Sequence, residues 1–325
     1  MTRVVRVHAY GGPEVLKVED IEIGAPAEGQ VRIRQTAIGL NFLDCYNRSG
    51  LYKQPSLPFI PGSEGAGVVT ELGKNVSGLK VGDRVAYAGP IGGYAEERLI
   101  AADRLVKVPA SVSDQMAAAM MLQGMTVEYL LNRTYKVGTK TVLLFHAAAG
   151  GVGLIACQWA RSIGATMIGT AGSPEKVALA KAYGCTHVID YRKEDFAARV
   201  REITGGALCD VVYDSIGKDT YLKSLDCLKP RGLFVLFGQS SGAVPPFDLN
   251  LLSQKGSLFA TRPSLMAYTA KRDELEASAA ALFEKVASGA VKVEISQSYP
   301  LSRVADAHRD LEARKTTGST VLLPG

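Results

Sequence analysis

Residues 141–153 read TVLLFHAAAGGVG, a short apolar strand that runs directly into a glycine-rich turn. The apolar run at residues 141–145 is typical of a strand covered on both faces. Residues 148–153 match the pattern G-x-G-x-x-G with alanine in the first place, and residues 154–162 have the apolar spacing of a helix. Small residues let the backbone approach a pyrophosphate, and the N–H groups and dipole at a helix start attract its charge. The stretch therefore predicts a dinucleotide-binding turn.

The residues after the second expected strand, 166–170, indicate which dinucleotide binds. A carboxylate at the end of this strand would accept hydrogen bonds from the adenosine ribose of NAD, and none is there. The chain instead has Gly172, Ser173 and Lys176, and the hydroxyl and ammonium groups suit a 2′-phosphate. Tyr191, after the third strand, could flank the same phosphate or be an ordinary tyrosine at a sheet edge. Lys176 could also be a solvated lysine, but the pattern favours NADPH over NADH.

Length and composition limit the class of protein. The chain has 325 residues, which suits two domains, and a formal net charge of +5 with basic and acidic side chains interleaved, so nucleic acid is not expected as a main partner. No secretory pattern and no apolar stretch of membrane length is present, so we expect a soluble, cytoplasmic protein. The five cysteines are scattered without a C-x-x-C pair, which fits neither a disulfide framework nor a zinc knuckle. They are Cys45, Cys157, Cys185, Cys209 and Cys227.

The regions on either side of the nucleotide segment have a different pattern. Residues 4–108 show short β-branched runs broken by turn signals, which predicts an antiparallel β domain. Ser113 is expected to cap a helix. The other elements expected here are helices over residues 115–122, from residue 126 to 131 and over 273–288, and strands over 291–295 and 320–323.

Four further motifs accompany the glycine turn: GGPEVL at residues 11–16, GLNFLD at 39–44, PGSEGAG at 61–67 and VGDRV at 81–85. With these motifs the whole chain resembles the medium-chain dehydrogenase/reductase superfamily, and within it the zinc-free NADPH:quinone oxidoreductases related to zeta-crystallin. The resemblance implies an α/β fold with two domains. These are a GroES-like antiparallel β catalytic domain, residues 1–124 and 263–325, and an NADP-binding Rossmann domain with a doubly wound parallel sheet, residues 125–262.

Two departures from the superfamily pattern exclude zinc catalysis. Zinc-dependent members place a cysteine where Asn41 stands and a histidine where Ser63 stands, and they add a lobe of four clustered cysteines that this chain lacks. Catalytic zinc needs three protein ligands, and an amide with a hydroxyl cannot replace a thiolate with an imidazole. We therefore expect no metal, and a structural role for Glu64.

The resemblance also implies which residues form the site. Asn41, Tyr46 and Tyr52 would hydrogen-bond a quinone oxygen as the catalytic residues, although the two tyrosines could instead be loop residues packing on a domain edge. His146 is expected to form hydrogen bonds at a strand end. The expected cofactor-binding residues are Asn41, Tyr129, Gly150, Gly151, Val152, Gly153, Gly172, Ser173, Lys176, Tyr191, Phe237, Gly238, Ser240, Arg262 and Arg314. The two arginines could alternatively be plain surface residues.

The activity that the resemblance implies is hydride transfer from NADPH to a quinone. The first alternative keeps the fold and cofactor but takes an α,β-unsaturated carbonyl as acceptor. The second is a non-enzymatic dinucleotide-binding protein with a crystallin-like or RNA-binding role. A homodimer is expected through residues 255–262, which read as the last strand of the nucleotide domain and would expose an unpaired edge.

Overall fold

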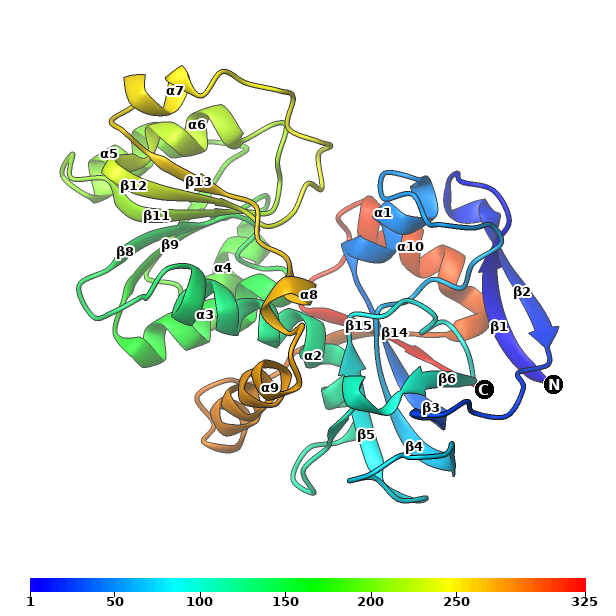
Figure 1. The fold of residues 1–325 in the computed structure, drawn as a ribbon. Helices are drawn as coiled ribbons and strands as arrows, with labels where there is room; N and C mark the ends of the chain where they lie inside the picture. The colour runs from blue at the N-terminus through cyan, green and yellow to red at the C-terminus, as the bar shows by residue number, and fades with distance from the viewer. The chain divides into compact units, whose positions relative to one another are not determined.

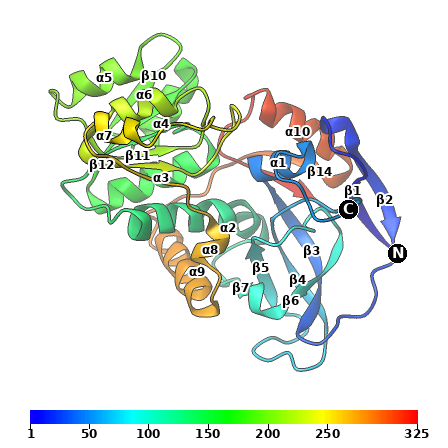
Figure 2. The same ribbon diagram turned by 45° about the horizontal axis from the view of Figure 1, so that its top comes forward.

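The computed structural model describes all 325 residues, and the chain forms two compact units (Figure 1; Figure 2). The first unit comprises Met1–Met125, Thr269–Ala287 and Val293–Gly325, and the second comprises Thr126–Tyr268 with Ser288–Lys292. The predicted functional domains, residues 1–124 with 263–325 and residues 125–262, stay a prediction.

The second unit contains a six-stranded parallel sheet in the order β10-β9-β8-β11-β12-β13. Its strands are β8 (Val142–Phe145), β9 (Thr166–Ala171), β10 (His187–Asp190), β11 (Cys209–Asp214), β12 (Leu228–Leu236) and β13 (Phe259–Thr261). The strand order reverses between β8 and β11, as in a doubly wound sheet. This confirms the predicted Rossmann fold and places β13 at one edge.

Helices cover both faces of this sheet (Figure 1). They are α3 (Gly151–Ile163), α4 (Pro174–Ala182), α5 (Phe196–Ile203), α6 (Tyr221–Asp226) and α7 (Asn250–Gln254), and the short helix α8 (Leu265–Tyr268) follows β13 and packs on α2 (Asp114–Tyr129). Phe196 and Val200 of α5 and Leu225 of α6 pack with Leu144 and Val212 of the sheet in one buried cluster. The wholly apolar sequence of β8 follows from burial on both faces.

The first unit is built on a seven-stranded sheet whose central strand, β3, pairs with β4, β6 and β15. Pairing is antiparallel throughout except between β14 and β15. The strands are β3 (Gln30–Leu40), β4 (Glu64–Leu72), β5 (Arg84–Ala88), β6 (Glu97–Ala101), β7 (Val106–Lys107), β14 (Ile295–Pro300) and β15 (Ser319–Leu323), with a separate hairpin of β1 (Thr2–Val7) and β2 (Leu16–Ile21). The predicted antiparallel β domain is confirmed.

The remaining helices are α1 (Phe42–Ser49), α2 (Asp114–Tyr129), α9 (Arg272–Ala287) and α10 (Val304–Glu312), with short 3₁₀ turns at Pro13–Val15, Ala102–Arg104 and Leu301–Arg303. The Ser113 hydroxyl accepts a hydrogen bond from the backbone N–H of Met116 at 3.2 Å, so the predicted cap is confirmed. None of the helices combines the length and hydropathy that crossing a bilayer requires.

One predicted strand was wrong, and one predicted helix lies in a longer helix that begins earlier than expected. No helix begins at residue 126, because α2 continues to Tyr129 and then widens into a π turn, Leu130–Thr134. The Tyr213 hydroxyl donates to the carbonyl oxygen of Leu130 at 2.8 Å and so supports this turn. No strand covers residues 291–295, because both backbone groups of Lys292 bond to the side chain of Gln158, at 2.8 and 3.0 Å. The strand β14 begins only at Ile295.

Candidate active site

The glycine turn between β8 and α3 forms an anion-binding cradle. Ala147 lies in the left-handed region at φ 56°, and its carbonyl oxygen accepts a hydrogen bond from the N–H of Gly150 at 3.0 Å. A Cβ on Gly153 would overlap that oxygen and lie 2.6 Å from the carbonyl carbon of Ala148, so only glycine fits there. The first-turn N–H groups of α3 have no acceptor within the helix, and the helix has 13 residues. The cradle fits a pyrophosphate group.

Four predicted residues lie beyond the carboxyl end of β9. Ser173 is the N-cap of α4, and its hydroxyl accepts a hydrogen bond from the backbone N–H of Lys176 at 3.3 Å. Tyr191 follows β10 and packs so closely on Gly172 that a Cβ there would lie 2.7 Å from its ring carbon Cζ. No acid ends β9, whose last residue is Ala171. The structure thus brings together the residues expected to face a 2′-phosphate.

A second group of predicted residues follows β12. The ring of Phe237 packs on that of Phe145, with centroids 5.4 Å apart. A Cβ on Gly238 would lie 2.8 Å from the carbonyl oxygen of Ser215, which also accepts a hydrogen bond from the N–H of Ser240 at 3.1 Å. Ligands bind beyond the carboxyl ends of strands in such sheets, and these residues lie there.

Arg262 follows β13 and donates from Nη1 to the carbonyl oxygen of Leu236, at 3.0 Å. It lies in the second unit with the cofactor group. Arg314 lies in the first unit, exposed and at φ 59°, just after α10. The structure therefore places only one of the two predicted arginines in the unit that carries the glycine cradle.

His146 is fully engaged in a buried network. Its Nδ1 lies 3.0 Å from the Thr170 hydroxyl, and its Nε2 lies 2.9 Å from the Ser224 hydroxyl. Ser224 donates to Asp214 Oδ2 at 2.8 Å, so it must accept from Nε2–H. Burial lowers the pKa of His146, which keeps the ring neutral. This confirms the expected strand-end hydrogen-bonding role.

Tyr129 is the last residue of α2, and sequence reasoning missed its partner, Tyr268. The two rings stack at 4.5 Å with an interplanar angle of 13°, and Tyr129 is only 2% exposed. The guanidinium of Arg133 lies over the ring of Tyr268, 5.0 Å from its centroid. Burial raises the pKa of the Tyr129 phenol, so the group is a neutral hydrogen-bonding group. No local pattern connects residues so far apart in the chain.

The first unit carries the remaining predicted residues on and around α1. The rings of Tyr46 and Tyr52 meet edge to face, with centroids 5.3 Å apart and an interplanar angle of 68°. The N–H of Tyr52 also donates to the carbonyl oxygen of Tyr46 at 3.0 Å. Both side chains are half-buried. The structure therefore brings the two predicted catalytic tyrosines together.

Buried polar side chains fix the start of α1. Asp44 Oδ2 accepts hydrogen bonds from the backbone N–H of Asn41 and from the Tyr94 hydroxyl, both at 2.9 Å. The same hydroxyl lies 2.9 Å from Nε2 of His308, and Arg48 pairs with Glu312 at 2.6 Å. Burial raises the pKa of Asp44 to about 7. Sequence reasoning identified none of these supporting residues.

The side chain of Asn41 is held as well. Its Nδ2 donates to Glu64 Oε2 at 2.7 Å, and its Oδ1 accepts from Gln123 Nε2 at 3.3 Å. Glu64 is completely buried, and burial raises its pKa to about 8. Three His, Cys, Asp or Glu side chains are nowhere grouped so that they could hold a metal ion. Amide, hydroxyl and carboxylate groups around Asn41 and Ser63 do not fit the donor set of a catalytic zinc.

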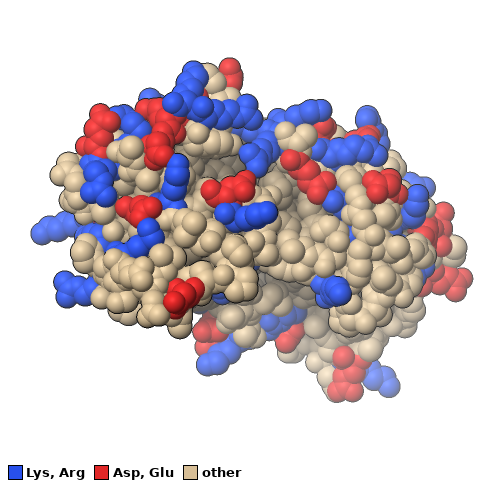
Figure 3. Space-filling model, turned by 90° about the horizontal axis from the view of Figure 1, so that it is seen from above, with Lys and Arg blue, Asp and Glu red and all other residues tan.

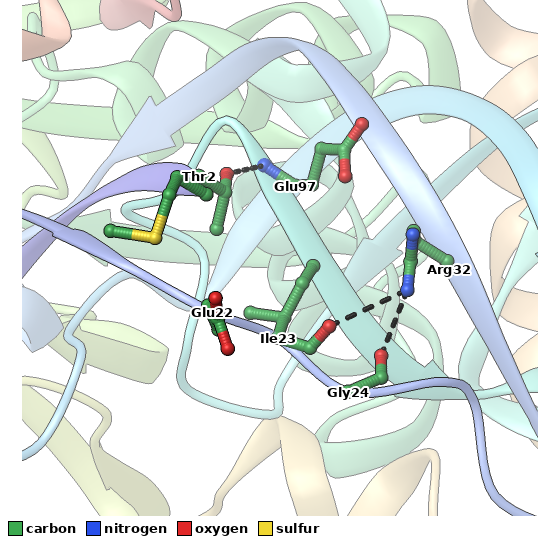
Figure 4. Close-up of a pocket in the computed structure, with 7 residues that line it drawn as sticks. Thr2, Glu22, Ile23, Gly24, Arg32 and Glu97 are labelled. Atoms are coloured by element: carbon green, nitrogen blue, oxygen red, sulfur yellow. Dashed lines mark hydrogen bonds between the residues drawn. The ribbon is translucent and has the colours of Figure 1, made fainter.

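A pocket in the first unit lies beside the N-terminal strand and is unconnected with these residues (Figure 4). It is lined by Met1, Thr2, Glu22, Ile23, Gly24, Arg32 and Glu97. The Arg32 guanidinium points to the chain at one wall and donates to the carbonyl oxygens of Gly24 at 2.9 Å and Ile23 at 3.4 Å. Its cation therefore holds a loop, and none of the predicted site residues lines this pocket.

Comparison with known proteins agrees with this arrangement. Residues 27–110 match the alcohol dehydrogenase GroES-like domain, and residues 151–284 match the zinc-binding dehydrogenase model. The chain is 52% identical to the quinone oxidoreductase of Pseudomonas aeruginosa and 46% identical to the 2-haloacrylate reductase of a Burkholderia species, with 100% of this chain covered in both and 100% and 99% of the relatives. The crystal structure of Escherichia coli quinone oxidoreductase complexed with NADPH superposes with a TM-score of 0.98 at 49% identity, over 99% of this chain and 100% of that one. The chain therefore belongs to the medium-chain dehydrogenase/reductase superfamily and, within it, to the quinone oxidoreductase family.

Proposed function

We propose that this protein is a quinone oxidoreductase that uses NADPH. The observation that carries the proposal is the similarity, over the whole chain, to quinone oxidoreductases, one of them solved with NADPH. The glycine cradle and the hydroxyl and ammonium groups of Ser173 and Lys176 support the choice of cofactor, because they suit a pyrophosphate and a 2′-phosphate.

We assign the cofactor to the Rossmann domain and the quinone to the GroES-like domain. When bound, NADPH supplies a hydride, and a quinone accepts it readily because reduction gives an aromatic product. Asn41, Tyr46 and Tyr52 hydrogen-bond the quinone oxygens and stabilise the negative charge that develops there. The residues of the glycine cradle, with Gly172 and Tyr191, hold the adenine side of the dinucleotide, and Tyr129, Phe237, Gly238, Ser240 and Arg262 complete the cofactor site of this unit. Arg314 of the first unit stays a predicted cofactor contact.

We propose that quinone reduction by this protein requires no metal ion. An amide and a hydroxyl, from Asn41 and Ser63, stand where zinc-dependent relatives use a thiolate and an imidazole. Metal analysis of the purified protein should give less than stoichiometric zinc, and chelators should leave quinone reduction unchanged. One tightly held zinc per chain, with activity lost on its removal, would contradict the assignment.

We propose a cytoplasmic homodimer. The strand β13 pairs with β12 on one side only, and Phe259 on it is 62% exposed. An open strand edge with an exposed aromatic side chain is suited to pairing with the same strand of a second copy around a two-fold axis.

A second candidate activity is reduction of α,β-unsaturated carbonyl compounds. The similarity to a 2-haloacrylate reductase supports it, since a haloacrylate is a conjugated acid that can also receive hydride at carbon. A nucleic-acid-binding role has less support. On the face shown in Figure 3, Lys and Arg side chains are intermixed with Asp and Glu, without a large patch of one sign.

Steady-state assays with NADPH against a panel of quinones, enones and 2-haloacrylates test these alternatives directly. The proposal expects the largest kcat/KM for a quinone, with NADH a poor donor. A larger kcat/KM for an enone or haloacrylate would favour the second activity. Absence of turnover with every acceptor, together with tight NADPH binding, would favour a non-enzymatic role.

A further inference from the structure

A chain of hydrogen bonds runs through the side chain of Asn41 and joins three elements of the first unit. Glu64, at the start of β4, accepts from Asn41 Nδ2 at 2.7 Å, and Gln123 of α2 donates to Asn41 Oδ1 at 3.3 Å. Ser319, at the start of β15, donates to Gln123 Oε1 at 2.8 Å. The amide of Asn41 therefore lies between Gln123, whose own amide can turn over, and Glu64, whose carboxyl group can become a donor when it takes up a proton.

The charge of Glu64 decides which way this amide points. Its Oε1 accepts from the backbone N–H of Leu122 at 2.8 Å, so both carboxylate oxygens face N–H donors. An ionised carboxylate can only accept hydrogen bonds. With Glu64 ionised, the nitrogen of the Asn41 amide must therefore face Glu64, and the oxygen must face Gln123.

We propose that Glu64 is a positioning residue whose charge sets the orientation of the Asn41 amide, and that proton uptake by Glu64 reverses this amide. This inference rests on the proposed function, and its consequence concerns quinone reduction. Glu64 and Gln123 leave the second proton of Asn41 Nδ2 and the second lone pair of Oδ1 unused. When the amide turns over, this donor and this acceptor exchange places. A position that offers an N–H to a quinone oxygen with Glu64 ionised would offer a lone pair with Glu64 neutral.

The reversed arrangement gives Glu64, Gln123 and Ser319 each a partner. It gives up the capping contact between the Asn41 side-chain oxygen and the N–H of Asp44, which keeps the backbone carbonyl oxygen of Asn41 as its acceptor at 3.0 Å. A protonated Glu64 Oε2 would donate to Asn41 Oδ1, and Asn41 Nδ2 would donate to a reversed Gln123 amide, whose Nε2 would donate to the Ser319 hydroxyl. Ser319 Oγ already lies 2.9 Å from the carbonyl oxygen of Ala119 as well as 2.8 Å from Gln123. A hydroxyl has one proton, so it can serve Gln123 in one state and Ala119 in the other.

The surroundings of Glu64 bring its proton uptake into an accessible pH range. Complete burial raises its pKa to about 8, and the like charge of Asp44 on α1 acts in the same direction. Tyr87 of β5 also senses the charge of Glu64, and burial raises its own pKa, so it stays neutral. Glu64 forms none of the ion pairs of the structure, and the hydrogen bonds from Asn41 and from the backbone N–H of Leu122 are the largest effects that oppose its protonation.

The variant Glu64→Gln imitates the neutral state. Its side-chain oxygen would take the N–H of Leu122, and its nitrogen would donate to Asn41 Oδ1, which fixes the reversed amide without an unsatisfied group. At saturating NADPH, we expect wild-type kcat/KM for a quinone to rise with pH as Glu64 ionises, and the variant to stay at the low-pH level. The ratio of wild type to variant should grow from about 1 near pH 6 to about 10 above pH 9, the effect of one hydrogen bond.

Tyr87→Phe is the matched control, because it removes a buried hydroxyl of the same sheet that bonds to Gln35 and not to Asn41. Its ratio to wild type should be the same at every pH. A pH-independent ratio for Glu64→Gln would overturn the inference and leave the proposed function intact, whereas a wild type without quinone activity would overturn the function itself.

If Glu64→Gln does not fold, the wild type still provides the test. The Asn41 side-chain ¹⁵N–¹H resonances, assigned by their loss in Asn41→Asp, should shift between two states at the midpoint of the activity profile. Resonances that stay constant across that midpoint would refute the reversal.

Discussion

Replacing Gly153 by alanine should damage the cofactor cradle before any cofactor is bound. The new methyl group would overlap the carbonyl oxygen of Ala147 and lie 2.6 and 2.7 Å from two backbone atoms of Ala148. These atoms belong to a turn tied to β9 by the hydrogen bond from Ala148 N–H to the carbonyl oxygen of Thr170 at 2.9 Å, so they cannot simply move aside. We expect a loss of about 1–3 kcal/mol in the free energy of unfolding, as for overpacked interiors.

Gly150→Ala provides the control from the same turn. Its Cβ would meet only the Ala147 carbonyl oxygen, at 3.3 Å, and its backbone, at φ −79° and ψ 171°, suits any residue. Thermal unfolding without cofactor should show a midpoint lowered by about 4–8 °C for Gly153→Ala and by about 1 °C for Gly150→Ala. NADPH affinity measured by calorimetry should fall at least tenfold for Gly153→Ala. Equal midpoints for the two variants would refute the steric argument.

Four further outcomes are expected. Lys176→Ala should raise the NADPH dissociation constant roughly tenfold and leave that of NADH unchanged, and equal affinity of the wild type for both cofactors in calorimetry would contradict the phosphate assignment. Tyr46→Phe or Tyr52→Phe should each lower kcat/KM for a quinone about ten to a hundredfold at constant NADPH affinity, and unchanged turnover in both would make them scaffold residues. Light scattering at micromolar concentration should give a dimer mass for the wild type and a monomer mass for Phe259→Asp, and a monomeric wild type would refute the edge pairing. Folded Glu64 keeps its proton up to about pH 8, and the unfolded side chain loses it near pH 4, so Glu64 should lower the free energy of unfolding by about 2 kcal/mol from pH 6.5 to 8; in urea titrations Glu64→Gln should remove this contribution and leave the smaller one of Asp44, whose pKa is about 7.

The sequence predicted those parts of the fold that depend on signals between residues close together in the chain. The glycine turn follows an apolar strand and precedes a helix, and each of these signals lies within residues 141–163. The edge position of β13 followed from its place as the last strand before the chain leaves the sheet. By contrast, the expected strand at residues 291–295 failed, because a side chain from α3 takes the backbone groups of Lys292. Such long-range competition leaves no local signal.

The candidate site divides in the same way. Gly172, Ser173 and Lys176 are consecutive or nearly so, and their grouping near Tyr191 needed only the order of strands in a doubly wound sheet. The stacked partner of Tyr129 and the side chains that hold Asn41 come from distant segments, and hydrophobic periodicity says nothing about them. Glu64 was expected to be structural, which describes its burial but not its contact with a predicted catalytic amide.

The two buried acids of the first unit are best understood through Asn41. A completely buried carboxyl is costly to keep, and an apolar replacement of similar volume is often neutral or stabilising. Asp44 nevertheless holds the backbone N–H of Asn41, and Glu64, when ionised, holds its side-chain nitrogen, so the two acids fix both ends of the same residue. Neither contact extends the hydrophobic core, but together they leave one amide with a defined direction at the start of α1. A cost in stability at these two positions is expected if the predicted role of Asn41 requires its amide to point in one direction before the substrate arrives.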